Sequence, residues 1–552
     1  MKNELLFCPL GGSGEIGMNM NLYAYGPEEN RKWIIVDMGV SFADDSIPGI
    51  DLIYPDPGFI IDKKNDILGI VLTHAHEDHI GSIVFIWPKL NCKIYATPFT
   101  AALIKEKFKE KKIDISNHLR VVALDSKIKL GPFEIDFITL THSILEPNGL
   151  SINTPSGMIL HTGDWKVDPN PLIGKKVDEK KLKDLGKKGI KTMICDSTNV
   201  FSPGRAGSEL DVRKSLLQII ENKKKRVLVT SFASNVARME TIFYCAEKTN
   251  RIICLVGRSM HRIFKAAREC GYLKNVKDPV DPRDAKKISR EKILYLCTGS
   301  QGEPMGALNR IINETHPDVF LEKGDAVIFS SKMIPGNEKK LYFLQNLIVK
   351  KNIENITEEN AFVHVSGHPN REDLKDMYNW VKPNCVIPVH GEHRHMREHV
   401  EFAKEMQVPS TLLIENGDIV KILPGDVPKI IDKAPIGKMY LDGDIAVGKD
   451  SNSIKERRNL ASNGYLEVTV ILNSSGNIKK TVISLKGIPE NLNGEAFTFD
   501  IEDEVNNICK TFSLKNKNQE KNLIETLKQN CRKILKEKTG KKPYTQINIA
   551  RV

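Results

Sequence analysis

The chain contains, at residues 73–81, the stretch Thr73-His74-Ala75-His76-Glu77-Asp78-His79-Ile80-Gly81. An apolar segment at residues 67–72 precedes it and has the length of a buried strand, and the apolar residues that follow are spaced as in a helix that buries one face. We therefore expect residues 74–79 to form the loop where a core strand leads into a helix, which is a rigid place to hold ligands. Neutral imidazole and carboxylate are ligands that zinc prefers, so this loop is predicted to bind metal.

Length and composition limit the class of protein. A chain of 552 residues is too long for one ordinary core, which predicts two or three domains, and its 40% hydrophobic and 27% charged content is typical of a soluble globular protein. No apolar run approaches the roughly 18 residues that a membrane-spanning helix needs, and the N-terminus has the pattern of a strand and not of a signal peptide. The ten cysteines form no C-x-x-C pair. We expect a cytoplasmic protein without disulfides and without a membrane partner.

The net charge of +11 is concentrated near the C-terminus, where residues 451–552 hold 18 Lys and Arg against 11 Asp and Glu. A basic surface attracts polyanions such as nucleic acids. A genome whose base composition favours lysine codons would give the same excess, so charge alone does not decide the partner.

The pattern of elements changes along the chain. Residues 1–199 alternate short apolar strands with Gly/Pro turns and few helices, which predicts layered sheets flanked by helices. Residues 205–365 alternate strands with helices, as in an open α/β domain with a mainly parallel sheet. A stretch of linker-like composition follows residue 426 and runs to about residue 453. The last unit is predicted to hold a β-hairpin, two helices and a final strand.

Two short motifs each allow two interpretations. Residues 12–17 match G-x-G-x-x-G, but the next residues have the pattern of a strand, so we interpret them as a Gly-rich turn and keep a nucleotide site as the alternative. Residues 231–235, Ser-Phe-Ala-Ser-Asn, follow a strand and lead into a helix. They could contact a phosphate, or simply form a turn with a helix N-cap.

Several other polar side chains follow the ends of apolar strands. Asp37, His142 and Asp164 do so in the first part of the chain, and His368 and His390 do so after the α/β segment. One such residue is usually a turn or capping residue. Several strands that end in the same chemistry indicate one shared rim, and we expect the metal site there.

Taken together, these residues resemble the signature of the metallo-β-lactamase fold, H-x-H-x-D-H followed by a later His and Asp. The matching positions are His74, His76, Asp78, His79, His142 and Asp164, with Asp37 as a supporting acid. The resemblance implies a sandwich of two sheets between helices (αββα). It also implies two divalent metal ions, the first bound by His74, His76 and His142, with Asp164 bridging to a second that is bound by Asp78, His79 and one more histidine.

Three further motifs resemble the β-CASP branch of that fold, which contains nucleases. They are an acid after a strand (Asp196), a histidine in Ser366-Gly367-His368, and His390 in Pro-Val-His-Gly. Within the branch, the motifs Gly-Gly-x-Gly-Glu-Ile-Gly-x-Asn, Thr-His-x-His-Glu-Asp-His, Ser-Phe-Ala-Ser-Asn and His-Gly-Glu are similar to those of bacterial ribonuclease J.

The resemblance implies five segments and a role for each motif. Residues 1–205 and 366–430 form the metallo-β-lactamase domain, 206–365 an inserted α/β β-CASP domain, 431–453 a linker, and 454–552 a small C-terminal α+β domain. His390 completes the second metal site, and Asp78 and Asp164 supply negative charge between the ions. The catalytic set is His368, Asp196 and Asp78, in which His368 protonates the leaving oxygen and Asp196 orients its ring. The groups that bind an RNA phosphate are Ser231, Ser234, Ser366, Gly367 and His368.

The function implied is a metal-dependent ribonuclease that cuts single-stranded RNA from the 5′ end and also internally, in mRNA decay and rRNA maturation. Histidine-rich ligation favours zinc, whereas bridging carboxylates also tolerate manganese. A homodimer or homotetramer is expected, with partners in RNA degradation. The alternatives are a tRNA 3′-processing or DNA-repair nuclease of the same fold, a small-molecule thioester or lactam hydrolase, and a non-catalytic RNA-binding scaffold.

Overall fold

The computed structural model describes residues 3–43, 47–425, 427–489, 491–492, 495–512 and 519–552, and these divide into two compact units. The first comprises the described residues of Met1–Ser41 and Tyr54–Ile436, and the second comprises those of Phe42–Ile53 and Gly437–Val552. Among the described residues, no helix is both long and apolar enough to cross a bilayer.

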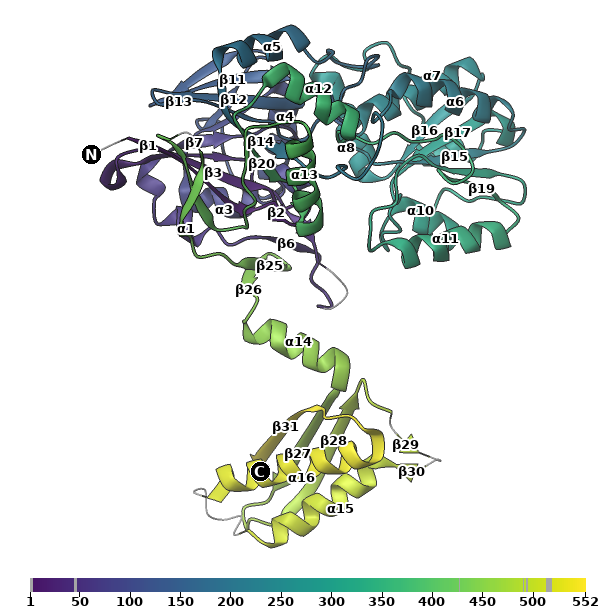
Figure 1. Ribbon diagram of the computed structural model, residues 1–552. Helices are drawn as coiled ribbons and strands as arrows, with labels where there is room; N and C mark the ends of the chain where they lie inside the picture. Colours follow the sequence, from purple (N-terminus) through teal and green to yellow (C-terminus); the bar gives the residue numbers. More distant parts are fainter. Residues whose placement is uncertain (1–2, 44–46, 426, 490, 493–494, 513–518) are drawn as a thin grey trace. The chain divides into compact units, whose positions relative to one another are not determined.

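Two sheets form the larger part of the first unit (Figure 1). The eight-stranded sheet has the order β24 (Lys429–Lys433), β23 (Asp418–Leu423), β1 (Glu4–Gly11), β3 (Met20–Gly26), β4 (Lys32–Val36), β7 (Ile67–Val71), β8 (Ile94–Ala96) and β9 (Leu119–Val121). The seven-stranded sheet has the order β10 (Lys127–Leu130), β11 (Phe133–Thr139), β12 (Asn148–Thr154), β13 (Gly157–His161), β14 (Ile190–Asp196), β20 (Cys385–Val389) and β22 (Ser410–Thr411).

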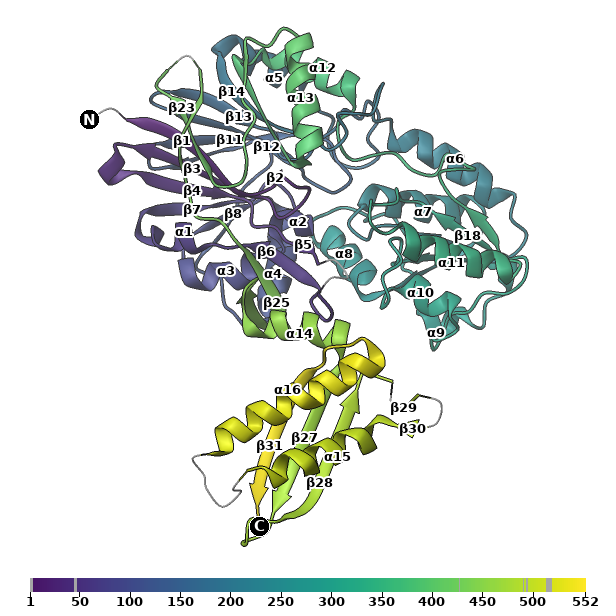
Figure 2. The same cartoon turned by 60° about the horizontal axis from the view of Figure 1, so that its bottom comes forward.

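The main core lies between these two sheets. Side chains of the first sheet, such as Phe7 and Tyr23, pack with side chains of the second, such as Phe137 and Leu150, in one buried cluster. A second cluster joins the outer face of the seven-stranded sheet to α5 (Glu179–Lys188), α12 (Arg371–Val381) and α13 (His393–Glu405). Helices α1 (Gly58–Ile61), α3 (Ile83–Leu90) and α4 (Pro98–Glu110) lie along the eight-stranded sheet (Figure 2). The predicted αββα sandwich is confirmed.

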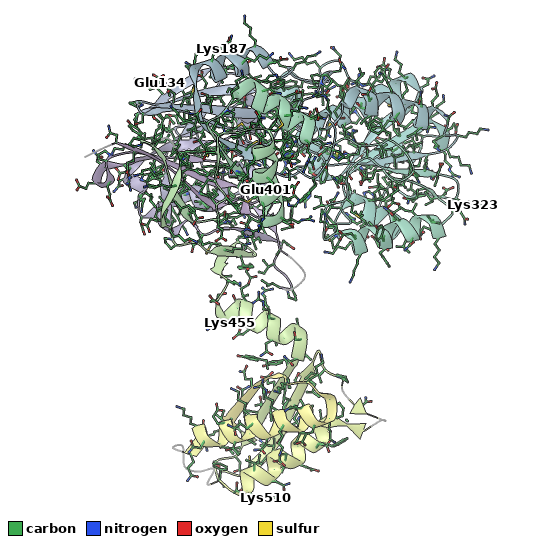
Figure 3. The ribbon with its side chains drawn as sticks, viewed as in Figure 1. Glu134, Lys187, Lys323, Glu401, Lys455 and Lys510 are labelled. Carbon is green, nitrogen blue, oxygen red and sulfur yellow. The ribbon has the colours of Figure 1, made fainter. Side chains whose placement is uncertain are left out.

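A separate five-stranded sheet is inserted in the sequence between β14 and β20. All of its strands are parallel, in the order β16 (Ile252–Val256), β17 (Ile293–Cys297), β15 (Val227–Thr230), β18 (Ala326–Phe329) and β19 (Glu354–Ile356). Its helices are α6 (Glu209–Glu221), α7 (Val236–Lys248), α8 (Arg258–Glu269), α9 (Pro282–Ala285), α10 (Ala307–Ile312) and α11 (Glu338–Lys350). Lys323 of this domain and Lys187 of the sandwich are exposed charged side chains, and both lie at the surface in Figure 3.

The described part of the second unit contains two larger sheets and the short pair β29 (Asn491–Leu492) and β30 (Glu495–Ala496). The strands β27 (Tyr465–Leu472), β28 (Ile478–Lys486) and β31 (Tyr544–Arg551) form one sheet, which packs with α15 (Phe497–Lys510) and α16 (Glu520–Thr539) around a buried cluster. The other sheet has the order β26 (Ile445–Gly448), β25 (Lys438–Asp442), β6 (Leu52–Pro55) and β5 (Ser41–Phe42). Helix α14 (Asn452–Asn463) follows β26.

Two segments with ambiguous sequences, residues 431–453 and residues 12–17, have a defined structure. Residues 431–453, which were expected to be a linker, contain β25 and β26 and part of β24. Of these strands, β25 pairs with the distant β6, a partner that local composition does not reveal. The Gly-rich residues 12–17 connect the antiparallel strands β1 and β3, with β2 (Ser13–Gly14) paired to β21 (Gly391–Glu392), and no helix starts there. This geometry favours the turn over the nucleotide site.

Candidate metal centre

The loop after β7 is held in place by the loop after β4. Met38 N–H donates to the His79 carbonyl (2.6 Å), and Val40 N–H donates to the Glu77 carbonyl (3.0 Å). The loop that was predicted for residues 74–79 is shorter than expected, because a short helix, α2 (Glu77–Ile80), begins at Glu77. Acidic residues in the first turn of a helix are favoured by the helix dipole. Asp78 and His79 both lie in this helix, and the hydrogen bonds to the loop after β4 fix the position of its backbone.

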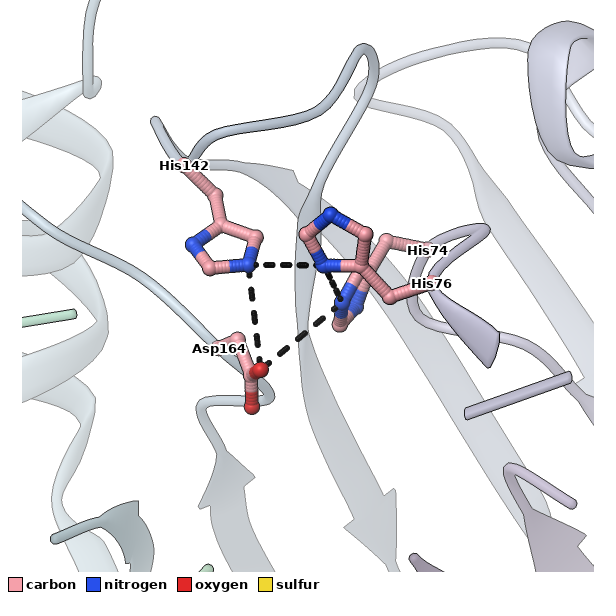
Figure 4. Close-up of side chains that lie close together, drawn as sticks. All are labelled: His74, His76, His142 and Asp164. Carbon is pink, nitrogen blue, oxygen red and sulfur yellow. Dashed lines mark hydrogen bonds and ion pairs between the residues drawn. The ribbon is translucent and has the colours of Figure 1, made fainter. Parts of the chain in front are cut away.

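The first group of converging side chains consists of His74, His76, His142 and Asp164 (Figure 4). His76 Nδ1 lies 3.2 Å from His74 Nε2 and 3.0 Å from His142 Nε2. Asp164 Oδ2 lies 3.8 Å from His74 Nε2 and 3.7 Å from His142 Nε2. Three ring nitrogens and a carboxylate oxygen thus surround one point, as the ligands of a divalent cation do.

The second group shares Asp164 and adds Asp78, His79 and His390. His79 Nε2 lies 3.2 Å from Asp164 Oδ2 and 3.6 Å from Asp78 Oδ2, and His390 Nε2 lies 3.7 Å from Asp78 Oδ2. His390 has a left-handed backbone (φ 52°), which is uncommon outside glycine and is concentrated at functional sites. We call the two groups together the His/Asp cluster: His74, His76, Asp78, His79, His142, Asp164 and His390. Its atoms suit a divalent metal ion.

Hydrogen bonds on the far side of the rings orient them. The His142 Nδ1–H donates to the Gly367 carbonyl (2.6 Å), and the His79 Nδ1–H donates to Asp37 (2.7 Å). Carbonyl and carboxylate oxygens can only accept, so in the neutral form of each ring the Nε2 atom faces the cluster with its lone pair. A ligating histidine usually has such a partner for its other nitrogen.

Two further rings are held in the same way, by residues that the sequence did not single out. His390 Nδ1 lies 2.9 Å from Asn19 Oδ1, and His74 Nδ1 lies 3.0 Å from the Thr73 hydroxyl. That hydroxyl in turn donates to Asp37 (2.7 Å). Asn19 closes the motif Gly-Gly-x-Gly-Glu-Ile-Gly-x-Asn and Thr73 opens the histidine motif, so their place in the motifs was the available signal.

Burial and charge act differently on the individual rings. Burial, followed by neighbouring imidazoles, holds the pKa of His74 and of His142 well below its ordinary value, and burial lowers the pKa of His76 to about 4. These rings are neutral at neutral pH, as ligands must be. Burial also opposes the charge on Asp164, but His390 and His79 outweigh it and hold the pKa of that carboxyl well below its usual range.

A third group lies beside the cluster and consists of His368, Asp196 and the shared Asp164. His368 Nδ1–H donates to Asp196 Oδ2 (2.7 Å), and the other oxygen of Asp196 accepts from the backbone N–H (2.9 Å) and hydroxyl (2.8 Å) of Thr198. Burial lowers the pKa of His368, but Asp196 outweighs this and raises it to about 9. The ring is therefore a protonated, oriented acid at neutral pH.

The residues that were predicted to bind an RNA phosphate lie in different surroundings. Ser366 accepts a hydrogen bond from Asn199 (2.7 Å), and Gly367 packs so closely that an added Cβ would lie 2.7 Å from the His142 ring. Ser234 lies 3.1 Å from His76 Nε2. Ser231 is buried, and its hydroxyl has no hydrogen-bond partner among the described residues. Their contact with RNA stays a prediction.

Comparison with known families supports the class of protein that this arrangement defines. Residues 32–182 match the family described as "Beta-lactamase superfamily domain", and residues 353–412 match "Zn-dependent metallo-hydrolase RNA specificity domain". Residues 224–348 match "Ribonuclease J, beta-CASP domain", and residues 452–552 match "Ribonuclease J C-terminal domain". Fold, cluster and matches together define a metal-dependent hydrolase of the metallo-β-lactamase fold with a β-CASP insertion.

Curated relatives narrow this class. The chain is 38% identical to a ribonuclease J of Sinorhizobium meliloti over 100% of this chain and 98% of the relative, and 34% identical to a ribonuclease J of Thermus thermophilus over 98% and 94%. The chain belongs to the ribonuclease J family and is a metal-dependent ribonuclease. A crystal structure of a protein of unknown function from Enterococcus faecalis, 17% identical, shares the fold with a TM-score of 0.52 over 76% of this chain and 100% of that one.

Proposed function

We propose that the His/Asp cluster binds two divalent metal ions, zinc in the first instance and manganese as the alternative. His74, His76 and His142 would hold the first ion, Asp78, His79 and His390 the second, and Asp164 would bridge them. The proposal is supported by the spacing of the ligand atoms, which lie within 4.8 Å of one another in each group, and by the orienting hydrogen bonds on the far side of the rings. A dinuclear site with nitrogen and oxygen ligands is well suited to phosphodiester hydrolysis.

The residues around the cluster would divide the chemistry between them. When bound, the ions supply Lewis acidity to the scissile phosphate and a water nucleophile at neutral pH. His368 protonates the leaving 3′-oxygen, because its pKa of about 9 keeps the ring charged at neutral pH. Asp196 orients that ring through the 2.7 Å hydrogen bond and, through its charge, favours the protonated form.

RNA would be positioned by groups beside His368. We propose that the hydroxyls of Ser231, Ser234 and Ser366 and the backbone of Gly367 contact the phosphate of a neighbouring nucleotide. Recognition of a 5′-terminal phosphate there makes the enzyme a 5′-to-3′ exonuclease, and threading of an internal segment gives endonuclease activity. Such an enzyme would act in mRNA decay and rRNA maturation in the cytoplasm, as a homodimer or homotetramer with partners in RNA degradation.

The observation that best supports this function is that three groups of side chains converge on the buried Asp164. The non-catalytic scaffold is disfavoured, because each predicted ligand position holds a histidine or an aspartate and these side chains converge in two groups that share Asp164. The ribonuclease J relatives favour RNA cleavage over the tRNA-processing, DNA-repair and small-molecule alternatives.

The test uses purified protein with 5′-monophosphate, 5′-triphosphate and circular RNA, each with and without a chelator. We expect cleavage that needs metal, faster removal of nucleotides from the monophosphate end, and slower cuts in the circle. An Asp164→Asn variant should lose bound metal and activity together, whereas His316→Gln, in the inserted domain away from the cluster, should lose neither. Cleavage that survives the chelator would refute the metal role, and equal rates on the two 5′ ends would refute recognition of the terminal phosphate.

A further inference from the structure

The rings of the His/Asp cluster have hydrogen-bond partners for their outer nitrogens, and the partner of His76 comes from the inserted domain. His76 directs Nδ1 at the cluster, 3.0 Å from His142 Nε2, and directs Nε2 at the Ser234 hydroxyl at 3.1 Å. For Nδ1 to present a lone pair, the neutral ring must carry its proton on Nε2. The Ser234 oxygen is placed to accept that proton in a hydrogen bond.

Ser234 lies in the short loop between β15 and α7, and the residue after it is anchored in a buried network. Asn235 caps α7 by accepting from Arg238 N–H (2.9 Å), and its side-chain amide lies 3.3 Å from Glu209 Oε1. Asn235, Arg238 and Glu209 are 4%, 0% and 3% exposed. The loop that carries Ser234 is therefore fixed to the interior of its domain.

The same network connects the two segments by which the chain leaves the sandwich, near Glu209, and returns to it, near Val363. Arg238 forms a bidentate pair with Glu209 (3.0 and 3.1 Å) on the outgoing segment. Its Nη1 also donates to the Val363 carbonyl (3.0 Å) on the returning segment. The Glu209 N–H donates to Asp168 (3.0 Å), four residues after Asp164. The planar guanidinium of Arg238 has enough donors to bond Glu209 and Val363 at the same time.

We propose that Ser234 is a positioning residue of the metal centre: it fixes the orientation and tautomer of His76, and the buried Arg238–Glu209 pair holds it there. The inserted domain then contributes to metal affinity as well as to the binding of RNA. This inference rests on the proposed role of His76 as a metal ligand. It gives Ser234 a task that differs from the phosphate contact, and the two tasks are separable because metal affinity is measured without RNA.

The test measures the affinity of the full-length apo-protein for Zn²⁺ alone, by competition with a chromophoric chelator, and the visible spectrum of the Co²⁺-loaded protein. Ser234→Ala should weaken Zn²⁺ binding roughly 10-fold, as loss of a ligand's hydrogen-bond partner does. It should also alter the Co²⁺ spectrum, while the melting temperature of the apo-protein stays near that of the parent. Ser231→Ala is the matched control in the same loop, and its Zn²⁺ affinity should not change.

Arg238→Lys tests the network, because lysine keeps the positive charge but cannot form the bidentate hydrogen bonds of the guanidinium. It should weaken Zn²⁺ binding to a similar degree, and the double variant Ser234→Ala/Arg238→Lys should be no weaker than either one, since both act through His76. Additive losses would overturn the role of the network. If Arg238→Lys does not fold, the Ser234 and Ser231 variants still decide the role of Ser234.

The outcomes separate this inference from the function on which it rests. Unchanged Zn²⁺ affinity in Ser234→Ala, or an equal loss in Ser231→Ala, overturns the positioning role. His76→Ala should remove one ion from the metal count of the protein. If it does not, the assignment of His76 as a ligand fails, and the inference about Ser234 fails with it.

Discussion

Asp37 shows how much one buried carboxylate can organise. It is fully buried and accepts from Thr73 N–H (2.8 Å), the Thr73 hydroxyl (2.7 Å) and His79 Nδ1–H (2.7 Å). These bonds fix the start of the histidine loop and aim His79 Nε2 into the cluster. A charged acceptor with three donors is worth more than the separate bonds, since its removal leaves buried groups unpaired.

We expect Asp37→Asn to lower the free energy of unfolding by about 2–3 kcal/mol, because the amide cannot accept all three hydrogen bonds. Zn²⁺ affinity should fall by roughly 10- to 100-fold, as is usual when the orienting partner of a ligand is lost. Urea denaturation of the apo-protein and Zn²⁺ competition measure the two effects. Intact Zn²⁺ affinity in a folded variant would show that Asp37 does not orient a ligand.

The pair of His368 and Asp196 predicts a specific pH dependence. Burial lowers the pKa of His368, but Asp196 raises it to about 9, so the protonated acid is present below that pH and is lost above it. Asp196→Asn removes the negative charge, and the pKa of His368 should fall. The alkaline limb of kcat/KM should then move down by about 1–3 pH units. Activity at pH 8 should therefore drop more than activity at pH 6.

The control for this experiment is the parent enzyme at the same metal loading, because bound cations also act on His368. A profile that keeps its alkaline limb in Asp196→Asn, with activity lowered equally at each pH, would assign Asp196 a purely structural role.

Individual site residues could be predicted from the sequence where residue type and spacing alone indicate metal binding. This holds for the closely spaced His74, His76, Asp78 and His79. Asn19 and Thr73 did not stand out, because they form hydrogen bonds with His390 and Asp37, which lie far from them in the sequence. Likewise, Ser234 was predicted to touch phosphate, and its contact with a histidine 158 positions away could not be deduced from local spacing.

The turn after β4 packs closely against α2, the helix that carries two of the predicted metal ligands. Gly39 lies against α2, and a Cβ added there would be 1.7 Å from the backbone oxygen of Asp78. That oxygen cannot rotate away as a side chain could, so the helix that carries Asp78 and His79 would have to move. Glycine is needed here for close approach of two backbones.

We therefore expect Gly39→Ala to lower the free energy of unfolding by about 3 kcal/mol, the upper part of the usual range for overpacking, and to abolish binding of the second metal ion. Gly448→Ala is the control, since its Cβ would meet nothing within 4 Å and its backbone is not left-handed. Thermal unfolding and metal content measure both effects. A Gly39→Ala protein with parental stability and two ions would contradict this account.

Strands with a continuous apolar run were predictable, and those stabilised mainly by their neighbours were not. The apolar runs of β1, β7 and β15 predicted strands. No such run marks β12, whose sequence Asn-Gly-Leu-Ser-Ile-Asn-Thr is rich in residues that disfavour strands. This strand is buried between β11 and β13, and its pairing with both outweighs its weak propensity. Tertiary context of this kind has no local signal.

For the whole molecule, the division into two units has a consequence for truncation. The second unit includes Phe42–Ile53, which lies early in the sequence, together with the C-terminal part of the chain. Ile47 and Ile50 are buried against Tyr440 of β25 and Ile454 of α14. The composition of residues 431–453 predicts a linker at which the chain could be cut, but a cut there removes the partners of this early segment.

We expect a protein that ends at residue 463 to keep the Zn²⁺ affinity of the full chain, because it retains Tyr440 and Ile454. The part that is removed has a separate hydrophobic cluster, formed around α15 and α16. A protein that ends at residue 436 should expose Ile47 and Ile50, at a cost of about 1.5–3 kcal/mol for each side chain left exposed, and should aggregate more readily. Scanning calorimetry and light scattering distinguish the two. Equal behaviour of both truncations would show that the early segment does not depend on β25 and α14, and the boundary between the two units would then have to be drawn at the predicted linker after all.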